Sequence, residues 1–410
     1  MMRVAIIGAG VSGLSTAHFL KNRYEIKVFE KDSSPGGLIK CCRVEENLFH
    51  ICGGHVFNSK RQDVLDWFWK FFDQEEEFSK ADRNSAVYMN DDLLVPYPIE
   101  NHMYMFDKDT QSKFIDDILR LSANSVVPIN FEDFLRKQFG DTLYKLYFKP
   151  YNEKVWRRDL NKVPLSWLEG KLPIPTVQEM IYNNMNHVKD KAFVHATFWY
   201  EKNNGSQYLA DKLAEGLDIQ YNSEIKDISL RNGKWTVCGE EFDKTVFCGN
   251  IKDLPTMLRG VDISGYLDKI DNLEYHGTTA VFCEIKRNPY TWIYLPSPDY
   301  ECHRIICTGN FSLSNNAEGK MTATIEFTDY ISEEDIKENL KKVPYVKKYL
   351  THKYNQYTYP IQDIETRPFI KSLKSELSQS GFYLSGRFAD WEYYNMDAAM
   401  GAAMDLCKII

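Results

Sequence analysis

The feature that most constrains this chain lies within its first 30 residues, where a short apolar run leads directly into closely spaced glycines. Arg3 to Ile7 predicts a buried parallel strand, and the segment GAGVSG at 8–13 follows at once. A helical stretch over 14–22 and a second strand over 26–29 complete a unit that ends in Glu30. This order of elements predicts a Rossmann-like α/β domain that binds a dinucleotide.

Each glycine of the turn has a mechanical role in such a domain. Gly8 permits the tight turn, Gly10 lets a pyrophosphate approach the backbone, and Gly13 lets the helix pack closely on the strand. Glu30 lies 17 residues beyond Gly13, where a carboxylate can accept hydrogen bonds from ribose hydroxyls. A glycine turn in a helix–sheet fold without a ligand is the alternative that the pattern leaves open.

Composition excludes several classes of protein. The 410 residues suggest two or three domains, and the net charge of −8 offers no basic block for nucleic acid. No apolar run approaches the ~20 residues that span a bilayer, so we expect no stable membrane insertion and no cleaved leader. Nine scattered cysteines without a CxxC pair indicate reduced thiols in a cytoplasmic protein.

The residues after the second strand favour one dinucleotide. Glu30-Lys31, followed by Pro35-Gly36-Gly37, resembles the EKxxxxGG extension of the flavoproteins with two dinucleotide-binding domains. In those proteins the second glycine pair continues the wall around the cofactor. The resemblance therefore implies FAD rather than NAD.

Further along, the chain changes character several times. Residues 62–73 are predicted to form an amphipathic helix. Residues 106–184 are mostly helical, and Asn130 is the expected N-cap of a helix over 131–139. Alternating β-rich segments over 278–285 and 322–327 follow.

Between the helical and β-rich stretches, residues 216–249 read as a return to the cofactor domain. They contain a predicted strand at Ser223 to Ile225, a hairpin at Asn232-Gly233 and a strand over 245–248. We therefore expect a discontinuous FAD-binding domain of residues 1–82, 190–249 and 355–410, an inserted helical domain of 102–189, and an antiparallel β-sheet substrate domain of 83–101 and 250–354.

Four segments outside the glycine turn could carry chemistry, each with a plain structural alternative. Gly53-Gly54-His55 could meet a flavin ring or be an ordinary turn with a satisfied histidine. The basic and aromatic segment 150–158 could hold a nucleotide or be a solvated helix end. Arg304, on a predicted strand, faces either the surface or a cleft. Residues 382–404 predict a last strand and a small-residue helix, which packs on the cofactor or is simply terminal.

Together these segments resemble the UDP-galactopyranose mutases, flavoenzymes within the amine-oxidase and protoporphyrinogen-oxidase-like superfamily. The resemblance runs through nearly the whole chain. It rests on GAGVSG at 8–13, GGHVF at 53–57, YNEKVWRR at 151–158, YPIQD at 359–363 and GRFADWEYYNMD at 386–397. The first motif is generic to the superfamily, and the last three together are specific to mutase-like proteins.

The resemblance implies roles by position. His55 matches a histidine beside the flavin, Tyr151 and Trp156 match aromatics of a uridine pocket, and Arg304 matches an arginine that clamps the diphosphate. The implied catalytic residues are His55, Lys171, Arg304, Tyr359 and Tyr393. The implied substrate contacts are Tyr151, Trp156, Arg158, Arg304, Tyr359 and Tyr393. The implied cofactor contacts are Gly8, Gly10, Val11, Ser12, Gly13, Glu30, Lys31, Gly37, Leu38, Gly54, His55, Ile225, Gly386, Arg387, Asn395 and Met396, and no metal ligand is expected.

Two positions depart from the family pattern. Asn58 stands where bacterial mutases commonly have a second histidine, and Lys171 stands in for the arginine of a mobile loop when one gap is allowed. Lysine is a hydrated point charge rather than a planar fork, so we expect a looser grip on the diphosphate. The sugar could then differ from plain galactose.

The reaction that the resemblance implies interconverts the pyranose and furanose forms of a UDP-sugar through an adduct between the sugar and N5 of reduced flavin, with no net oxidation. An FAD-dependent oxidoreductase of the amine-oxidase class is the alternative, and a non-enzymatic FAD-binding protein is a third. The resemblance also implies cell-surface polysaccharide biosynthesis, NAD(P)H as a candidate reductant and a homodimer as a candidate assembly.

Overall fold

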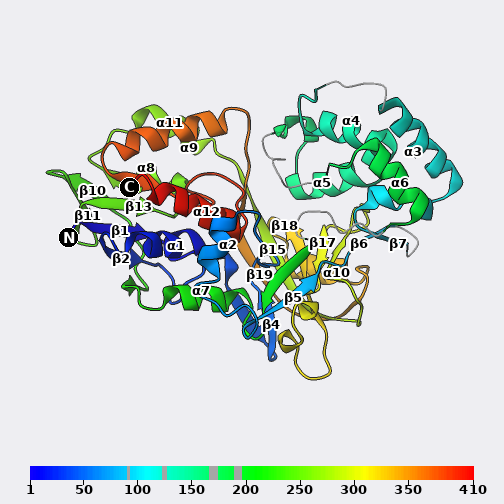
Figure 1. Ribbon diagram of the computed structural model, residues 1–410, viewed down its shortest axis with the longest axis horizontal. Coiled ribbons are helices and arrows are strands. Elements are labelled where there is room, and N and C mark those ends of the chain that lie inside the picture. Colours follow the sequence, from blue (N-terminus) through cyan, green and yellow to red (C-terminus); the bar gives the residue numbers. More distant parts are fainter. Residues whose placement is uncertain (90–92, 122–126, 166–173, 189–195) are drawn as a thin grey trace.

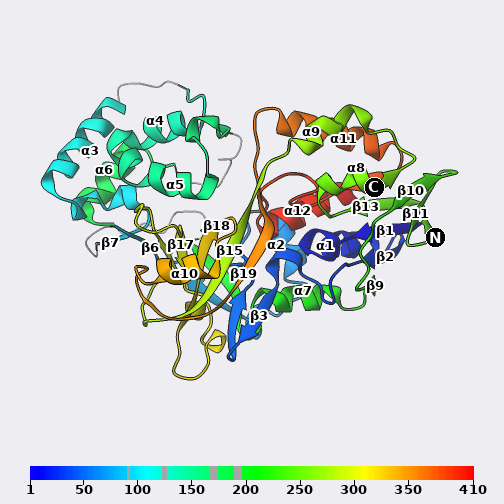
Figure 2. The same cartoon turned by 180° about the vertical axis from the view of Figure 1, so that it is seen from behind.

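The computed structural model describes residues 1–89, 93–121, 127–165, 174–188 and 196–410. Both chain termini lie in a unit built around a parallel sheet, at the left of Figure 1. A larger sheet fills the middle of the molecule, and a unit of helices lies over its other end, as Figure 2 shows from behind. We call these three parts the parallel-sheet unit, the large sheet and the helical unit.

The parallel-sheet unit contains five strands in the order β20-β13-β1-β2-β9, and all neighbouring pairs are parallel. This arrangement confirms the predicted Rossmann-like α/β fold. The strands are β1 (Arg3–Ile7), β2 (Glu25–Phe29), β9 (Ile219–Gln220), β13 (Lys244–Phe247) and β20 (Phe382–Leu384).

A glycine is required where α1 (Val11–Leu20) passes β1. A Cβ atom at Gly13 would lie 1.9 Å from the carbonyl oxygen of Gly8, so no larger residue fits there. On the same face of the sheet, α1 packs against α12 (Met396–Cys407). The first and last helices of the chain therefore share one layer.

A four-stranded sheet and α11 (Thr366–Ser378) cover the other face of the parallel sheet. The predicted hairpin is confirmed at Asn232-Gly233, where φ is 52° and 75° as a tight two-residue turn requires. The strand predicted at Ser223 to Ile225 is wrong, because the backbone there joins the end of β2 instead, through the Ser223 amide and the Glu30 carbonyl (2.8 Å). The strands of this sheet are β10 (Ile228–Arg231), β11 (Lys234–Val237), β12 (Glu240–Phe242) and β14 (Leu258–Arg259).

Residues 250–273 differ from the expectation that they begin the substrate domain. They form the short helices α8 (Leu254–Met257) and α9 (Leu267–Asp271), and β14 pairs with β10. Their apolar side chains, Ile251 among them, share a hydrophobic cluster with Phe247 of β13. This packing extends the parallel-sheet unit beyond the expected limit at residue 249.

The large sheet has seven strands in the order β19-β15-β18-β17-β16-β6-β7. All neighbouring pairs are antiparallel except β16 with β6, so the predicted antiparallel sheet is confirmed. Its longest strand, β19, runs across the expected domain boundary at residues 354 and 355. The strands are β6 (Ser85–Tyr88), β7 (Leu94–Pro96), β15 (Tyr275–Ile285), β16 (Trp292–Tyr294), β17 (Arg304–Ile306), β18 (Thr322–Thr328) and β19 (Val346–Pro360).

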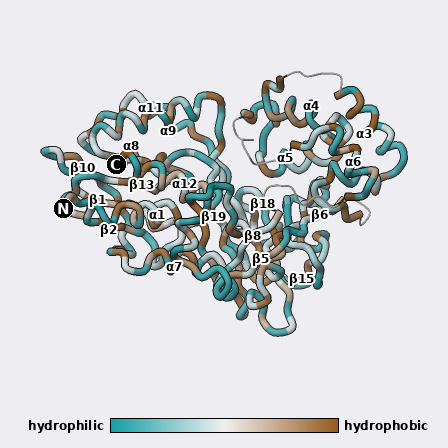
Figure 3. Tube along the Cα trace, in the orientation of Figure 1, coloured by the Kyte–Doolittle hydropathy of each residue, from teal (hydrophilic) through white to brown (hydrophobic). Residues whose placement is uncertain are grey.

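The helical unit contains the predicted capped helix. The Oδ1 atom of Asn130 accepts a hydrogen bond from the Asp133 amide (2.8 Å), which satisfies a free amide at the start of α4. Hydrophobic and hydrophilic residues alternate along these helices, as amphipathic packing requires (Figure 3). The helices are α3 (Lys108–Leu121), α4 (Phe131–Leu143), α5 (Lys149–Trp156) and α6 (Val177–Asn186).

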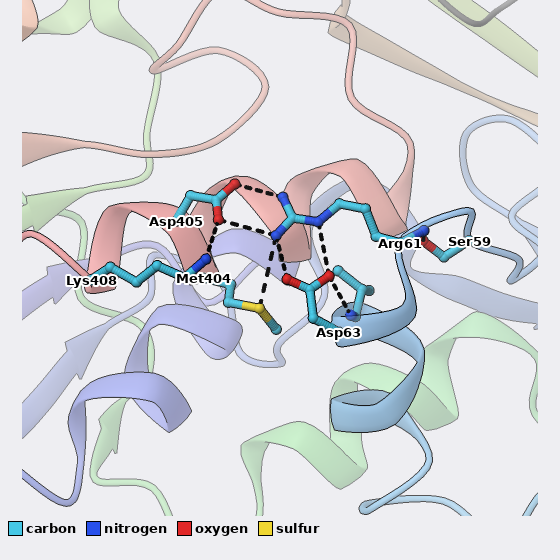
Figure 4. A network of polar contacts seen from close by, with 7 residues as sticks. Ser59, Arg61, Asp63, Met404, Asp405 and Lys408 are labelled. Atoms are coloured by element: carbon cyan, nitrogen blue, oxygen red, sulfur yellow. Dashed lines mark hydrogen bonds and ion pairs between the residues drawn. The ribbon is translucent and has the colours of Figure 1, made fainter.

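Helix α2 (Gln62–Phe68) is shorter than the predicted 62–73 and is fastened to α12 at the surface. Arg61 forms ion pairs with Asp63 (2.7 Å) and Asp405 (2.5 Å), as Figure 4 shows.

None of the described helices is long and apolar enough to cross a membrane. The remaining helices and strands are β3 (Cys41–Val44), β4 (Asn47–His50), β5 (Phe78–Asp82), β8 (Thr197–Glu201), α7 (Ser206–Ala214) and α10 (Glu333–Leu340).

Candidate functional site

A cavity of about 380 Å³ lies at the carboxyl ends of the parallel strands, where ligands bind in open α/β sheets. Its lining brings together segments that are far apart in the sequence. Of the expected cofactor contacts, it includes Gly8, Gly10, Val11, Ser12, Gly13, Glu30, Lys31, Gly37, Leu38, His55, Ile225, Gly386, Arg387, Asn395 and Met396.

The glycine turn has the shape of a cradle for a ligand. A Cβ atom at Gly10 would have no protein atom within 4 Å, although Gly10 lines the cavity. The carboxylate of Glu30 is buried and accepts hydrogen bonds from the amides of Ala9 (2.6 Å) and Asp32 (3.0 Å). A carboxylate has about four acceptor positions, so Glu30 can still accept bonds from ribose hydroxyls. These features fit FAD.

His55 lines the same cavity with a buried ring atom. Its Nε2 makes no hydrogen bond within the described part of the chain. Burial, together with the charge of Arg387, lowers the pKa of His55 to about 4. The ring is therefore neutral at pH 7 and has a polar atom that suits a hydrogen bond to a bound ring system.

Gly54 is the one expected cofactor contact that does not line this cavity. A Cβ atom there would lie 2.7 Å from Cγ2 of Ile306, so Gly54 packs against β17. Its neighbour Gly53 donates its amide hydrogen to Oε1 of Glu326 (2.9 Å). The glycine–histidine turn thus connects the cavity to the large sheet.

A polar cluster on the large sheet gathers three of the expected substrate contacts. Nη2 of Arg304 donates to the hydroxyl oxygen of Tyr359 (3.1 Å). The rings of Tyr359 and Tyr393 are stacked, with centroids 5.3 Å apart. The guanidinium of Arg387, which lines the cavity, lies 4.7 Å from the centroid of the Tyr393 ring. Arg387 therefore marks the point where cavity and cluster meet.

Glu326 of β18 completes this cluster, and the sequence interpretation missed it. It lies directly opposite Arg304 in the antiparallel register, and its carboxylate pairs with Nε of Arg304. Burial raises the pKa of Glu326, but Arg304 and His303 lower it more strongly, to about 2. The sequence signal that could have revealed Glu326 is a single charged residue within the strand TATIEFT, which is buried throughout.

The helical unit contributes one of its three expected contacts to this cluster. The ring of Tyr151 lies 5.4 Å from that of Tyr294 and 6.3 Å from that of His303. Trp156 is only 4% exposed and packs in a hydrophobic cluster shared by the helical unit and the large sheet, and Arg158 pairs with Glu274. The structure does not bring these two side chains to the cluster.

The two departures from the family pattern differ in what the structure reveals. Nδ2 of Asn58 donates to the Thr197 carbonyl (2.7 Å), which is a structural contact. Lys171 lies outside the described residues.

No group of three or more potential metal ligands occurs among the residues that the structure describes.

Comparison with known proteins gives similarities at three levels. A family model described as an NAD(P)-binding Rossmann-like domain matches residues 6–74. A UDP-galactopyranose mutase from Mycoplasma genitalium is 21% identical, over 97% of this chain and 92% of that protein. A dTDP-fucopyranose mutase from Escherichia coli is 27% identical over 42% of this chain and 46% of its own length.

The fold agrees with the full-length sequence match. A crystal structure of reduced UDP-galactopyranose mutase superposes with a TM-score of 0.89 at 23% identity, covering 100% of this chain and 93% of that one. The expected resemblance and fold class are therefore confirmed. Over its whole length, this chain is similar in sequence to the UDP-galactopyranose mutases and shares their fold.

Proposed function

We propose that this chain is an FAD-dependent mutase that interconverts the pyranose and furanose forms of a UDP-sugar without net oxidation. One observation carries the proposal: the cluster of Arg304, Tyr359 and Tyr393 meets the cofactor cavity at Arg387. Cationic and hydroxyl donors beside a flavin site suit a diphosphate. A neutral or apolar amine substrate would leave them without a role.

In this proposal FAD lies in the cavity, with the glycine turn at its pyrophosphate, Glu30 at its ribose and His55 at its ring system. When bound and reduced, FAD supplies the nucleophile for the anomeric carbon of the sugar. The parallel-sheet unit is then the FAD-binding domain, and the large sheet and the helical unit hold the substrate.

The chain itself stabilises the departing nucleotide. Arg304 and Tyr359 are positioned to donate hydrogen bonds to diphosphate oxygens as negative charge develops there. Glu326 fixes the Nε side of Arg304 and offsets the cost of burying its charge. Tyr147 stacks on one face of the Tyr151 ring, and in this proposal a nucleobase stacks on the other face.

The decisive experiment compares reduced and oxidised protein without oxygen. Protein reduced with dithionite is incubated with a panel of UDP- and dTDP-sugars, and the products are separated by chromatography. We expect furanose product only with reduced flavin, which stays reduced through many turnovers. Equal activity with oxidised flavin would disprove the proposal. In a separate aerobic assay, oxygen consumption in proportion to substrate would instead support the amine-oxidase alternative.

The finer features of the proposal need their own tests. The same assay with NADH or NADPH in place of dithionite tests the native reductant. Lys171→Ala and Lys171→Arg test the substituted loop arginine, and we expect roughly tenfold lower turnover for the alanine variant only. A cytoplasmic location, a homodimer and a role in cell-surface polysaccharide biosynthesis are proposed on the same resemblance.

A further inference from the structure

Lys154 of α5 holds a loop of the large sheet through its ammonium group. Its ammonium donates to the carbonyl oxygens of Leu295 (2.7 Å), Ser297 (2.5 Å) and Cys302 (3.3 Å). All three belong to the connection between β16 and β17. The three donors of one ammonium group thus match three acceptors of one loop.

That loop leads directly into the polar cluster. It is closed by the Leu295 amide, which donates to the His303 carbonyl (2.9 Å), and Arg304 follows as the first residue of β17. On the helix, Tyr151 precedes Lys154 by three residues and therefore lies on the same face. We call the three hydrogen bonds of Lys154 to these carbonyl oxygens the Lys154 cage. The cage fixes the position of Tyr151 relative to Arg304.

The C-terminal end of α5 has a separate attachment. His276 of β15 places Nε2 at 2.8 Å from the Trp156 carbonyl oxygen and Nδ1 at 2.9 Å from Oδ2 of Asp329. His276 is also the cross-strand partner of Tyr359. Loss of the Lys154 cage should therefore loosen α5 without detaching it.

We propose that Lys154 is a positioning residue for nucleotide-sugar binding, which holds Tyr151 and Arg304 at a fixed separation so that base and diphosphate are gripped together. This inference rests on the proposed function. It adds that the wall contributed by the helical unit is set before substrate arrives, because ordering that wall on binding would weaken affinity.

The test compares Lys154→Met with Lys149→Met, which removes an exposed lysine from the same helix. Methionine keeps the length and apolar stem of the side chain but removes its three donors. Since stacking of a base on an aromatic ring is worth roughly tenfold or more, we expect Lys154→Met to weaken UDP affinity by roughly three- to tenfold. Lys154→Arg should lie between, because its planar fork cannot serve three converging carbonyls. FAD content should be unchanged in all three variants.

A double-mutant cycle with Tyr151→Ala shows whether Lys154 acts through Tyr151. Once Tyr151 is truncated, Lys154→Met should have little further effect on UDP affinity. Fully additive effects would overturn the proposal, as would a Lys154→Met variant with unchanged affinity.

Hydrogen exchange distinguishes failure of the positioning role of Lys154 from failure of the proposed function. Lys154→Met should speed exchange in α5 and in residues 295–303, whereas Lys149→Met should not. Faster exchange together with no UDP binding by the parent protein would refute the proposed function alone. Unchanged exchange would refute the positioning role even if the parent binds UDP.

Discussion

The cofactor cavity and the polar cluster are built by different means. One wall of the cavity is the glycine turn, where β1, the turn and α1 follow one another in the chain. The cluster is made of side chains from β17, β18, β19 and the segment before α12. Local sequence dictates the glycine turn of the first site, whereas strand register places Arg304 beside Glu326 in the second. Changes in the two sites should therefore have separable effects.

Gly10→Val is expected to have the largest effect, and to affect the cofactor cavity without changing the polar cluster. The added side chain meets no protein atom but projects where Gly10 lines the cavity, so the variant should fold and purify without flavin colour. Gly265→Val is the matched control, because a Cβ atom there also meets nothing within 4 Å and Gly265 is exposed, away from the cavity. Stoichiometric FAD in a folded Gly10→Val protein would disprove the cofactor assignment.

The next effect belongs to the polar cluster. A charge-assisted contact to phosphate contributes about 1.5–3 kcal/mol, so Arg304→Ala should weaken UDP affinity roughly 10- to 100-fold and leave FAD content unchanged. It also leaves the buried Glu326 without its partner, which should lower the melting temperature.

Adding Glu326→Gln to Arg304→Ala distinguishes these two consequences. The double variant should recover melting temperature but not UDP affinity, because glutamine needs no counter-charge. Calorimetry for melting and flavin absorbance for UDP binding supply both readouts. If the double variant also regained UDP affinity, Arg304 would not be a ligand of the diphosphate.

A smaller, pH-dependent effect is expected on the cofactor side. The pKa of His55 is about 4 in the folded protein and near 6.5 when unfolded, so the unfolded chain binds the extra proton as pH falls. His55 therefore favours the folded state above pH 6.5, and this stability is lost between pH 6.5 and 4, by about 2 kcal/mol at pH 5.

The pH prediction is tested by following the melting temperature from pH 7.5 to 5. His55→Gln should flatten the decline, whereas His187→Gln, at an exposed histidine of the helical unit, should not. Equal slopes in the parent and the His55 variant would contradict a buried neutral ring.

The smallest effect is expected at the surface contact between α2 and α12. Arg61 and its partners Asp63 and Asp405 are each about 40–50% exposed, so water and salt screen their attraction. Arg61→Ala should shift the melting temperature by no more than about 3 °C and leave FAD content and UDP affinity as in the parent. Loss of flavin would show that this contact holds α12 at the cavity.

The Rossmann-like unit and the glycine-turn wall of the cavity could be predicted from the sequence. Strand periodicity, glycine spacing and the acid at Glu30 are local signals, because their elements are consecutive in the chain. The capped helix at Asn130 and the hairpin at Asn232-Gly233 are local in the same sense, and both occur as predicted. Residues 223–225 do not form the predicted strand, because three residues of sequence do not show whether a neighbouring strand is available to pair with them.

The tertiary structure was needed to show how the side chains of the polar cluster contact one another and to add Glu326 to them. Arg304 and Glu326 are 22 residues apart and face each other because one antiparallel register places them opposite, and a shift of one residue would separate them. Packing between the helical unit and the large sheet likewise buried Trp156 in a shared hydrophobic cluster and placed Lys154 beside three carbonyl oxygens, although both lie in one motif with Tyr151. Local sequence specifies backbone shape, but the direction and partner of a side chain depend on what packs against it.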